Sequence, residues 1–285
     1  MKTKLKLSLL AALLFSATTA FSQDTNFWIF LCFGQSNMES GGQMNDADRT
    51  VDKRFQVLAD FDNATRGWKK GQWYDAVPPL TARGRGISIV DYFGRTMVAN
   101  LPEKIRIGIV KCSVSGTKIE LWDKDAFRNY LTNLPASDAW KIPAANIYNN
   151  NPYQYLVDLA KIAQKDGVIK GILIHQGESN FEDPDWPKKV KKIYGDFMKD
   201  LDLKPADVTL LTGEVVNADH QGEKAAFNEI LKKLPETLPN SYTVSSAGLP
   251  CNSDHLHFTA EGQREFGKRY AEKLLSVMGY PVKQP

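Results

Sequence analysis

The stretch WIFLCFGQSNM, residues 28–38, joins an unbroken apolar run to a glycine and then to polar side chains. Six consecutive apolar residues fit a strand that is buried on both faces, as strands of a parallel sheet are. Gly34 permits a tight turn directly after the strand. We therefore expect Ser36 to lie at the carboxyl end of a buried strand, which is the edge where such sheets bind ligands.

Similar apolar runs alternate with helical patterns along the rest of the chain. The other predicted strands are residues 105–110, 169–174, 208–211 and 242–244. Between them apolar residues recur at helical spacing, which predicts helices around residues 90–101, 156–163, 190–201, 227–234 and 266–278. Thr259 is the expected N-cap of the last helix. This alternation predicts an α/β fold, a three-layer α/β/α sandwich with a mostly parallel five-stranded sheet.

Two long segments, residues 39–86 and 111–152, show neither pattern clearly. We expect them to be irregular and to cover a pocket at the edge of the sheet where the strands end. They contain four of the six tryptophans, Trp68, Trp73, Trp122 and Trp140.

The first 22 residues have the composition of a secretory signal peptide. A basic start with Lys2, Lys4 and Lys6 is followed by an apolar run from Leu7 and by small residues at the exit. No cysteine follows that would serve as a lipoprotein anchor. We therefore predict a signal peptide at 1–22, a single domain at 23–285, and a secreted or periplasmic location.

The net charge does not point to a nucleic-acid partner. The chain has 36 Lys and Arg against 33 Asp and Glu, and three of the lysines lie in residues 1–22. The remaining residues therefore have equal numbers of both charges, whereas binding driven by counterion release needs a basic face. The only long apolar run is the one in the signal peptide, so we expect no membrane-spanning helix.

Three cysteines, Cys32, Cys112 and Cys251, are an odd number, so at least one of them has no partner within the chain. Two interpretations stay open. The cysteines act as small buried hydrophobic residues, or Cys112 and Cys251 form a disulfide.

Ser36 has a potential catalytic partner set near the end of the chain, in the run Asp254-His255-Leu256-His257. A serine nucleophile needs a base, and the base needs a carboxylate that fixes its tautomer. Asp254 and His257 are three residues apart, so one turn of chain can bring them together. Two alternatives stay open: a metal site made by Asp254, His255 and His257, or an Asp/His pair that caps the last helix.

Two further polar segments follow predicted strands. Residues 113–117 contain Gly116, whose backbone N–H is unobstructed by a side chain, and residues 175–180 form a polar run after an apolar strand. Acyl transfer needs such hydrogen-bond donors to stabilise the developing oxyanion. Both segments are therefore candidates for an oxyanion hole.

Together these segments resemble the SGNH-hydrolase superfamily, and most closely its carbohydrate-esterase branch of family six acetylxylan esterases and sialate O-acetylesterase-like proteins. They occur in the order of that family between residues 27 and about 275. The matching stretches are Gly34-Gln35-Ser36-Asn37-Met38, Ser115-Gly116-Thr117 with Ile119-Glu120-Leu121-Trp122, His175-Gln176-Gly177-Glu178-Ser179, and DHLHFTAEG at 254–262. The resemblance implies a flavodoxin-like sandwich.

The resemblance also implies roles for single residues. Ser36 would be the nucleophile, His257 the general base and Asp254 its orienting carboxylate. The oxyanion donors would be the backbone N–H groups of Ser36 and Gly116 and the side chain of Gln176.

The third segment departs from the wider superfamily, where the pattern is G-x-N-D. Here it reads Gly177-Glu178-Ser179-Asn180, and we favour Gln176 over Asn180 as the amide donor. Gln35, Glu178 and Asn180 are candidates for contacting the substrate or orienting the loops.

As a function, the resemblance implies a serine esterase that removes O-acetyl groups from an acetylated oligo- or polysaccharide through an acyl-enzyme, without a metal or organic cofactor. Two alternatives stay open. One is a lipid or thioester hydrolase of the same superfamily, and the other is a non-catalytic glycan-binding protein on this fold. The mixture of Trp and Tyr with Asn, Asp, Gln and Lys in residues 39–86 and 111–152 favours sugar over an acyl chain.

Overall fold

The apolar run at 28–33 forms the middle of the central strand β1. The computed structural model of the protein describes residues 23–39, 41–81 and 84–282, so the expected signal peptide lies outside the described residues. The sheet has seven strands in the order β3-β2-β4-β1-β5-β6-β7. Their bounds are β1 Asp24–Gly34, β2 Phe55–Leu58, β3 Trp73–Asp75, β4 Arg106–Ser113, β5 Gly167–His175, β6 Thr209–Gly213 and β7 Ser241–Val244.

The five strands expected from the sequence are all present and all parallel, but the expected strand number was wrong. The two additional strands, β2 and β3, lie in the segment that we expected to be irregular. β2 has only four residues and pairs in parallel with β4, and β3 has three and is antiparallel to β2. Neither strand shows an apolar run long enough to be recognised in the sequence, because β2 has four residues and β3 has three.

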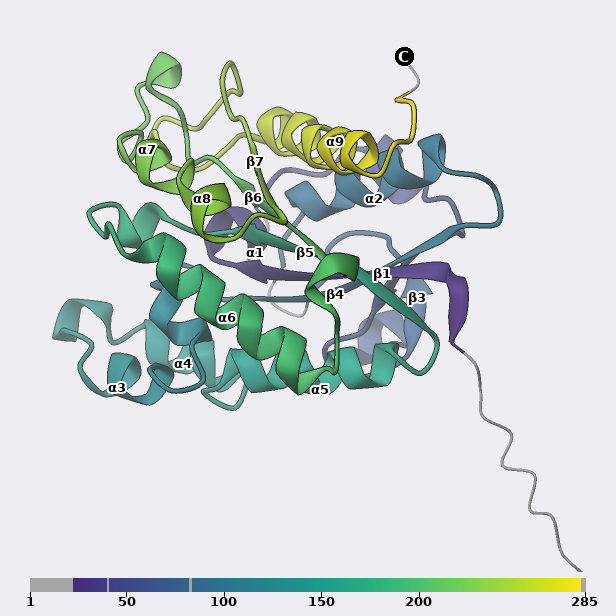
Figure 1. Ribbon diagram of the computed structural model, residues 1–285, viewed down its shortest axis with the longest axis horizontal. Coiled ribbons are helices and arrows are strands. Elements are labelled where there is room, and N and C mark those ends of the chain that lie inside the picture. Colours follow the sequence, from purple (N-terminus) through teal and green to yellow (C-terminus); the bar gives the residue numbers. More distant parts are fainter. Residues whose placement is uncertain (1–22, 40, 82–83, 283–285) are drawn as a thin grey trace, which may run out of the picture.

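Helices cover both faces of the sheet, as Figure 1 shows. α2 and α9 lie on one face, and α5 and α6 lie on the other. The bounds of the helices are α1 Ser36–Glu39, α2 Ile89–Asn100, α3 Phe127–Thr132, α4 Lys141–Asn146, α5 Pro152–Ala163, α6 Trp186–Asp200, α7 Phe227–Leu231, α8 Leu234–Thr237 and α9 Ala260–Val277. The predicted α/β/α sandwich is thus confirmed.

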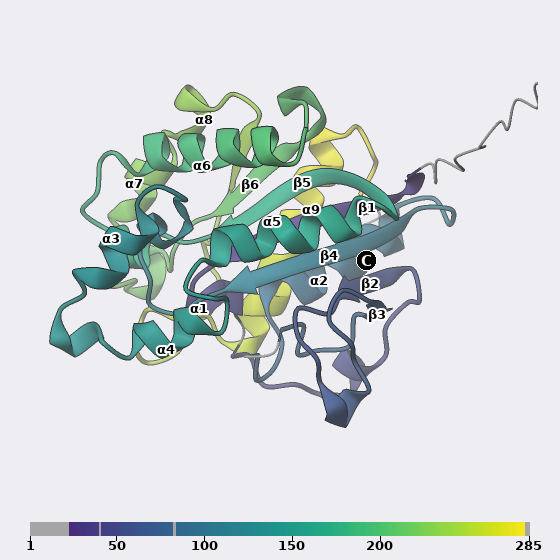
Figure 2. The same cartoon turned by 90° about the horizontal axis from the view of Figure 1, so that it is seen from below.

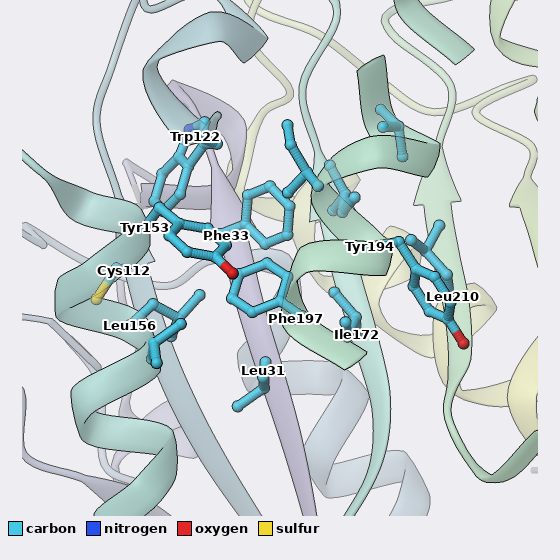
Figure 3. Close-up of a cluster of buried hydrophobic side chains, with 14 of the residues drawn as sticks. Leu31, Phe33, Cys112, Trp122, Tyr153, Leu156, Ile172, Tyr194, Phe197 and Leu210 are labelled. Atoms are coloured by element: carbon cyan, nitrogen blue, oxygen red, sulfur yellow. The ribbon is translucent and has the colours of Figure 1, made fainter. Parts of the chain in front are cut away.

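Alternate side chains of β1 enter the two cores, which is why its sequence is apolar throughout. Ile29, Leu31 and Phe33 pack with α5 and α6, while Trp28, Phe30 and Cys32 pack with α2 and α9. Figure 3 shows the first core, in which Phe33 lies beside the aromatic rings of Trp122 and Phe197.

Most helices agree with the sequence pattern. Thr259 caps α9, and its hydroxyl accepts the N–H of Gly262 at 3.1 Å. The helix expected at 227–234 is instead interrupted, with α7 ending at Leu231 and α8 beginning at Leu234. Pro235 lacks the N–H that a continuous helix would donate to the carbonyl of Leu231, so the helix breaks there.

The segment at 111–152 is also more regular than expected, because it contains α3 and α4. In Figure 2 these two helices lie at the end of the sheet toward which β4 and β5 point, on the same side as α1. They therefore stand beside the edge where Ser36 emerges.

All three cysteines are free thiols in the structure, so Cys112 and Cys251 do not form a disulfide there. Cys32 and Cys112 are buried in β1 and β4, and Cys251 is partly exposed. Within the residues that the structure describes, no helix combines the length and the apolar character needed to cross a membrane.

Candidate active site

The candidate site forms where three neighbouring strands end together. Gly34, the last residue of β1, is paired with Ser113 at the end of β4 and with His175 at the end of β5. The three polar segments predicted from the sequence therefore begin side by side. Only glycine permits this close approach of β1 to β5, because a β-carbon at Gly34 would overlap the carbonyl oxygen of His175.

Ser36, His257 and Asp254 form a continuous chain of hydrogen bonds. The Oγ atom of Ser36 lies 2.8 Å from Nε2 of His257, although the two residues are 221 positions apart in the sequence. Nδ1 of the same imidazole lies 2.7 Å from Oδ2 of Asp254. With Asp254 ionised, Nδ1 donates to the carboxylate, and Nε2 is then the acceptor for the hydroxyl proton of Ser36.

The carboxylate of Asp254 is held in its charged form. Its other oxygen accepts the backbone N–H groups of Leu256 and His257, both at 3.0 Å. Partial burial by itself would raise the pKa of Asp254, but the hydrogen bonds from the His257 ring and from these two N–H groups lower it to about 2. The group is therefore negative at any pH at which an imidazole is neutral.

Asn37, which follows the serine, fixes the loop that carries His257. Its amide donates to the carbonyl of Leu256 at 3.0 Å, and its oxygen accepts the N–H of Phe258 at 3.1 Å. The residues on both sides of His257 are thus bound by one side chain of α1. This role could not be predicted from the sequence, because it depends on a contact between distant parts of the chain.

Glu178 in turn holds Asn37. Its Oε1 atom accepts the Asn37 amide at 2.7 Å and lies 3.3 Å from Nε2 of His175. Burial opposes ionisation of Glu178, but the neighbouring His175 ring and the hydrogen bonds lower its pKa below the ordinary value. Glu178 is buried and bound to Asn37, so its place in the structure is that of a loop-orienting residue.

Two backbone N–H groups are available for an oxyanion. In the part of the chain that the structure describes, neither the N–H of Ser36 nor that of Gly116 has a hydrogen-bond partner. Gly116 has a φ of 68°, in the left-handed region that favours glycine, and this turn sets the direction of its N–H.

Gln176 and Asn180 are buried and bonded to each other, with Nε2 of Gln176 2.6 Å from Oδ1 of Asn180. Nε2 of Gln176 also lies 3.2 Å from the carbonyl oxygen of Thr117 and 3.4 Å from Oε1 of Gln35. The Asn180 amide donates to Glu120 and Asp183. Both amides are thus engaged with protein groups, so an oxyanion role for either requires a change of partner and stays a prediction. Gln35 is buried in the same network.

Glu39, at the end of α1, is a second residue that the sequence analysis did not identify. Its Oε2 atom accepts the backbone N–H of Ser115 at 2.9 Å and the hydroxyl of Ser115 at 2.5 Å. The buried Nζ of Lys111 donates to the backbone carbonyl of Glu39 at 2.9 Å. The helix of the serine is therefore tied directly to the segment that contains Gly116. The only feature of the sequence that could have indicated this role is an acidic residue three positions after Ser36.

The two alternatives for the C-terminal segment do not fit the geometry. Nδ1 of His255 lies 3.0 Å from the carbonyl oxygen of His220. Among the described residues, the ligand atoms of Asp254, His255 and His257 do not converge as a metal site requires. The helix cap is Thr259 rather than Asp254.

A serine, a histidine and an aspartate bonded in this order at the carboxyl edge of a parallel sheet are an arrangement of serine hydrolases. The chain belongs to the carbohydrate esterase family described as sialic acid-specific acetylesterase, whose family model matches residues 26–276. The protein is therefore a carbohydrate acetylesterase, that is, a carboxylic ester hydrolase.

Known relatives agree with this assignment. A probable carbohydrate esterase of Arabidopsis thaliana, At4g34215, is 25% identical over 264 residues, which cover 87% of this chain and 90% of the relative. The crystal structure of that Arabidopsis protein has a TM-score of 0.66, at 22% identity and with 87% and 98% of the two chains covered.

Two further solved structures share the fold. NanS has a TM-score of 0.64 at 17% identity, with 90% of this chain and 99% of NanS covered. XAC1771, a carbohydrate acetylesterase from Xanthomonas citri, has a TM-score of 0.61 at 20% identity, with 87% and 56% covered.

Proposed function

We propose that this protein is an exported serine esterase that removes O-acetyl groups from carbohydrate through an acyl-enzyme on Ser36. The observation that carries the proposal is the chain of hydrogen bonds from Ser36 Oγ through the His257 ring to Asp254, at 2.8 and 2.7 Å. It supplies a nucleophile, a base and a carboxylate that orients the base. Residues 1–22, with the pattern of a signal peptide, support export.

In the first half of the proposed reaction, Ser36 Oγ attacks the acetyl carbonyl carbon while its proton moves to Nε2 of His257. The tetrahedral intermediate collapses as the bond between that carbon and the sugar oxygen breaks. His257 gives its proton to the departing sugar oxygen, and the acetyl group remains on Ser36. The Asp254 carboxylate stabilises the imidazolium that forms between these steps.

In the second half, a water molecule takes the place of the sugar. His257 accepts a proton from this water as its oxygen attacks the acetyl-Ser36 carbonyl carbon. Collapse of the second intermediate releases acetic acid and returns the proton to Ser36 Oγ. The N–H groups of Ser36 and Gly116 would stabilise the negative oxygen in both halves, since both lack a protein partner in the described part of the chain.

The surroundings of the site favour a sugar over a long acyl chain. A cavity of about 340 Å³ beside the third segment is lined largely by polar and charged groups, among them Lys118, Glu120, Asn180 and Asp183. A fatty acyl group would cover these polar and charged groups with apolar surface, which is unfavourable, whereas sugar hydroxyls can hydrogen-bond to them.

The test is acetate release from a panel of acetylated xylan, mannan, pectin and O-acetylated sialic acid, by the wild-type protein and by Ser36→Ala. We expect at least one carbohydrate to be deacetylated, and we expect kcat to fall by about 10³-fold or more in the variant. Wild-type turnover by Ser36→Ala would contradict the serine mechanism. Faster hydrolysis of long-chain esters or thioesters than of every acetylated sugar would favour a lipid or thioester hydrolase instead.

A further inference from the structure

Trp140 is an exposed aromatic side chain that lies directly against the candidate oxyanion segment. It is 50% exposed, the largest exposed fraction among the large hydrophobic side chains of the described chain. A β-carbon built on Gly116 would come within 2.7 Å of Cη2 and 2.9 Å of Cζ2 of Trp140. The edge of the indole ring therefore packs on Gly116, while much of the ring remains open to solvent. The exposed position of Trp140 is explained neither by the hydrogen bonds of Ser36, His257 and Asp254 nor by packing in the core.

The ring is held by a firmly anchored segment. Trp140 directly precedes α4, in which Ala144 and Ala145 are buried. The next residue, Lys141, is largely buried and pairs with Asp138 at 2.8 Å. Earlier in the same segment, Lys124 pairs with Asp196 and Asp200 of α6 at 3.2 and 2.9 Å. An exposed aromatic ring on an anchored segment is pre-organised for contact with a ligand.

A cavity lies on the side of Lys141, whose Nζ is 5.6 Å from the centre of the Trp140 ring. It has a volume of about 510 Å³, in the size range of small-ligand sites. Its lining mixes polar and aromatic groups and includes Lys118, Tyr130, Asn133, Asp138, Lys141 and Ser179. Lys141 connects it to Gly116, because Cε of Lys141 lies 3.4 Å from the same β-carbon position. Lys118 directly follows the segment 113–117, and Ser179 lies in the segment 175–180; both segments begin beside Gly34. The cavity therefore lies next to the candidate oxyanion hole.

We propose that Trp140 and this cavity form a binding site for the sugar part of the substrate, in which the indole face stacks on a sugar ring and the cavity receives the hydroxyl groups. The proposal rests on the proposed esterase function and deepens it. A sugar ring has one face of polarised C–H bonds, which complements the negative face of an indole ring. The amide, hydroxyl and charged groups of the cavity supply hydrogen-bond partners for the sugar hydroxyls.

The first experiment compares kcat/KM for O-acetylated sialic acid and acetylated xylo-oligosaccharides with kcat/KM for p-nitrophenyl acetate, which has no sugar. In Trp140→Ala, we expect the ratio of sugar ester to p-nitrophenyl acetate to fall about tenfold, mainly through KM. Trp140→Phe should restore part of the ratio. Ile142→Ala is the matched control. Ile142 is 42% exposed and lies two residues after Trp140, but it lines a different cavity.

The second experiment measures binding without chemistry. Calorimetry with xylotetraose and with N-acetylneuraminic acid is performed on Ser36→Ala and on the double variant that also carries Trp140→Ala. We expect at least one of the two sugars to bind to the first protein and to bind about tenfold more weakly to the second.

The two experiments separate the two proposals. Absence of turnover on every acetylated sugar, with sugar binding that still depends on Trp140, would remove the esterase function but keep the binding site. An unchanged substrate ratio in Trp140→Ala would overturn the binding site and leave the esterase function intact. The binding site would also be overturned if the two Ser36→Ala proteins bound the sugars equally, or if neither sugar bound.

Discussion

Glu39 shows how a single carboxylate joins two parts of the proposed machinery. It lies at the end of the helix that begins with Ser36, and it receives both the N–H and the hydroxyl of Ser115. Because Gly116 follows Ser115 directly, the position of its N–H depends on Glu39. We regard Glu39 as a positioning residue, since it acts on the reaction through Ser115.

Glu39→Gln should lower kcat on p-nitrophenyl acetate by about tenfold with little change in KM, because charge-assisted hydrogen bonds to Ser115 are replaced by weaker ones. Steady-state kinetics on the purified variant would measure this. Glu265→Gln, on the exposed side of α9, is the control and should behave as the wild type. A parallel loss of thermal stability with unchanged kcat would show that Glu39 has only a structural role.

The dependence of activity on pH distinguishes His257 from Asp254. Since the pKa of Asp254 is held at about 2, this group stays ionised above about pH 4 and contributes no change in activity there. We expect kcat/KM to fall at acid pH, because a general base must be unprotonated to accept the proton of Ser36. A profile that is flat down to pH 4 would contradict this mechanism.

Asp254→Asn should lower kcat by about 10²–10⁴-fold, because the amide no longer fixes the reactive tautomer of His257. His255→Ala is the natural comparison, since the ring of His255 is directed to the carbonyl of His220 and not to Ser36. Kinetics of both variants at pH 8 would test the assignment. Equal losses in the two variants would count against it.

Residues with distinctive chemistry could be predicted from the sequence, and residues with a purely geometric role could not. Ser36, His257 and Asp254 were candidates by residue type and spacing, and the family resemblance implied their roles. The structure brings them within hydrogen-bond distance. Asn37 and Glu39 could not be assigned in this way. Their partners lie far away in the sequence. The parallel register of β1, β4 and β5 brings Ser115 and Glu178 close, and the loop before α9 brings Leu256 and Phe258.

At the level of elements, long periodic segments were predictable and short ones were not. α2, α5, α6 and α9 follow the apolar spacing of the sequence because each buries one continuous face. β2 and β3 depend on pairing at the edge of the sheet, and the division between α7 and α8 depends on one proline.

Asp48 connects three elements through one buried carboxylate. It lies in a short turn and accepts hydrogen bonds from Arg264 of α9 at 2.7 Å and from Tyr92 of α2 at 2.9 Å. Burial opposes its ionisation, but the bonds from Arg264, the Asn45 N–H and Tyr92 lower its pKa to about 2. A carboxyl whose pKa is lower in the folded state than in the unfolded state stabilises the fold above its ordinary pKa, near pH 4. That stabilisation is lost as the pH falls toward 2.

Asp48→Asn should therefore lower the free energy of unfolding by about 2 kcal/mol at neutral pH, and the difference from the wild type should disappear near pH 2. Urea denaturation at several pH values would measure both effects. Asp52→Asn serves as the control, because Asp52 and Arg54 form a partly exposed ion pair for which less than about 1 kcal/mol is expected. Equal effects of the two substitutions would contradict this account of Asp48.

For the molecule as a whole, the free cysteines report on global unfolding. Cys32 and Cys112 lie in the two central strands and are fully buried, and this burial raises the pKa of both thiols. We expect a thiol reagent to modify Cys251 in the native protein and the other two only when the sheet opens. Mass spectrometry of labelled peptides over time would distinguish them, and a denatured protein with a single reactive thiol would reveal a disulfide.

The hydrogen bond between Ser36 and His257 joins residues 221 positions apart, and this has a consequence for biosynthesis. A nascent chain that already contains the nucleophile has no base for it until a further 221 residues have been made. The last segment must also dock on Asn37 before His257 reaches the serine. Hydrolytic activity should thus begin only after Asp254 and His257 have been made, and any truncation upstream of residue 254 should yield an inert protein.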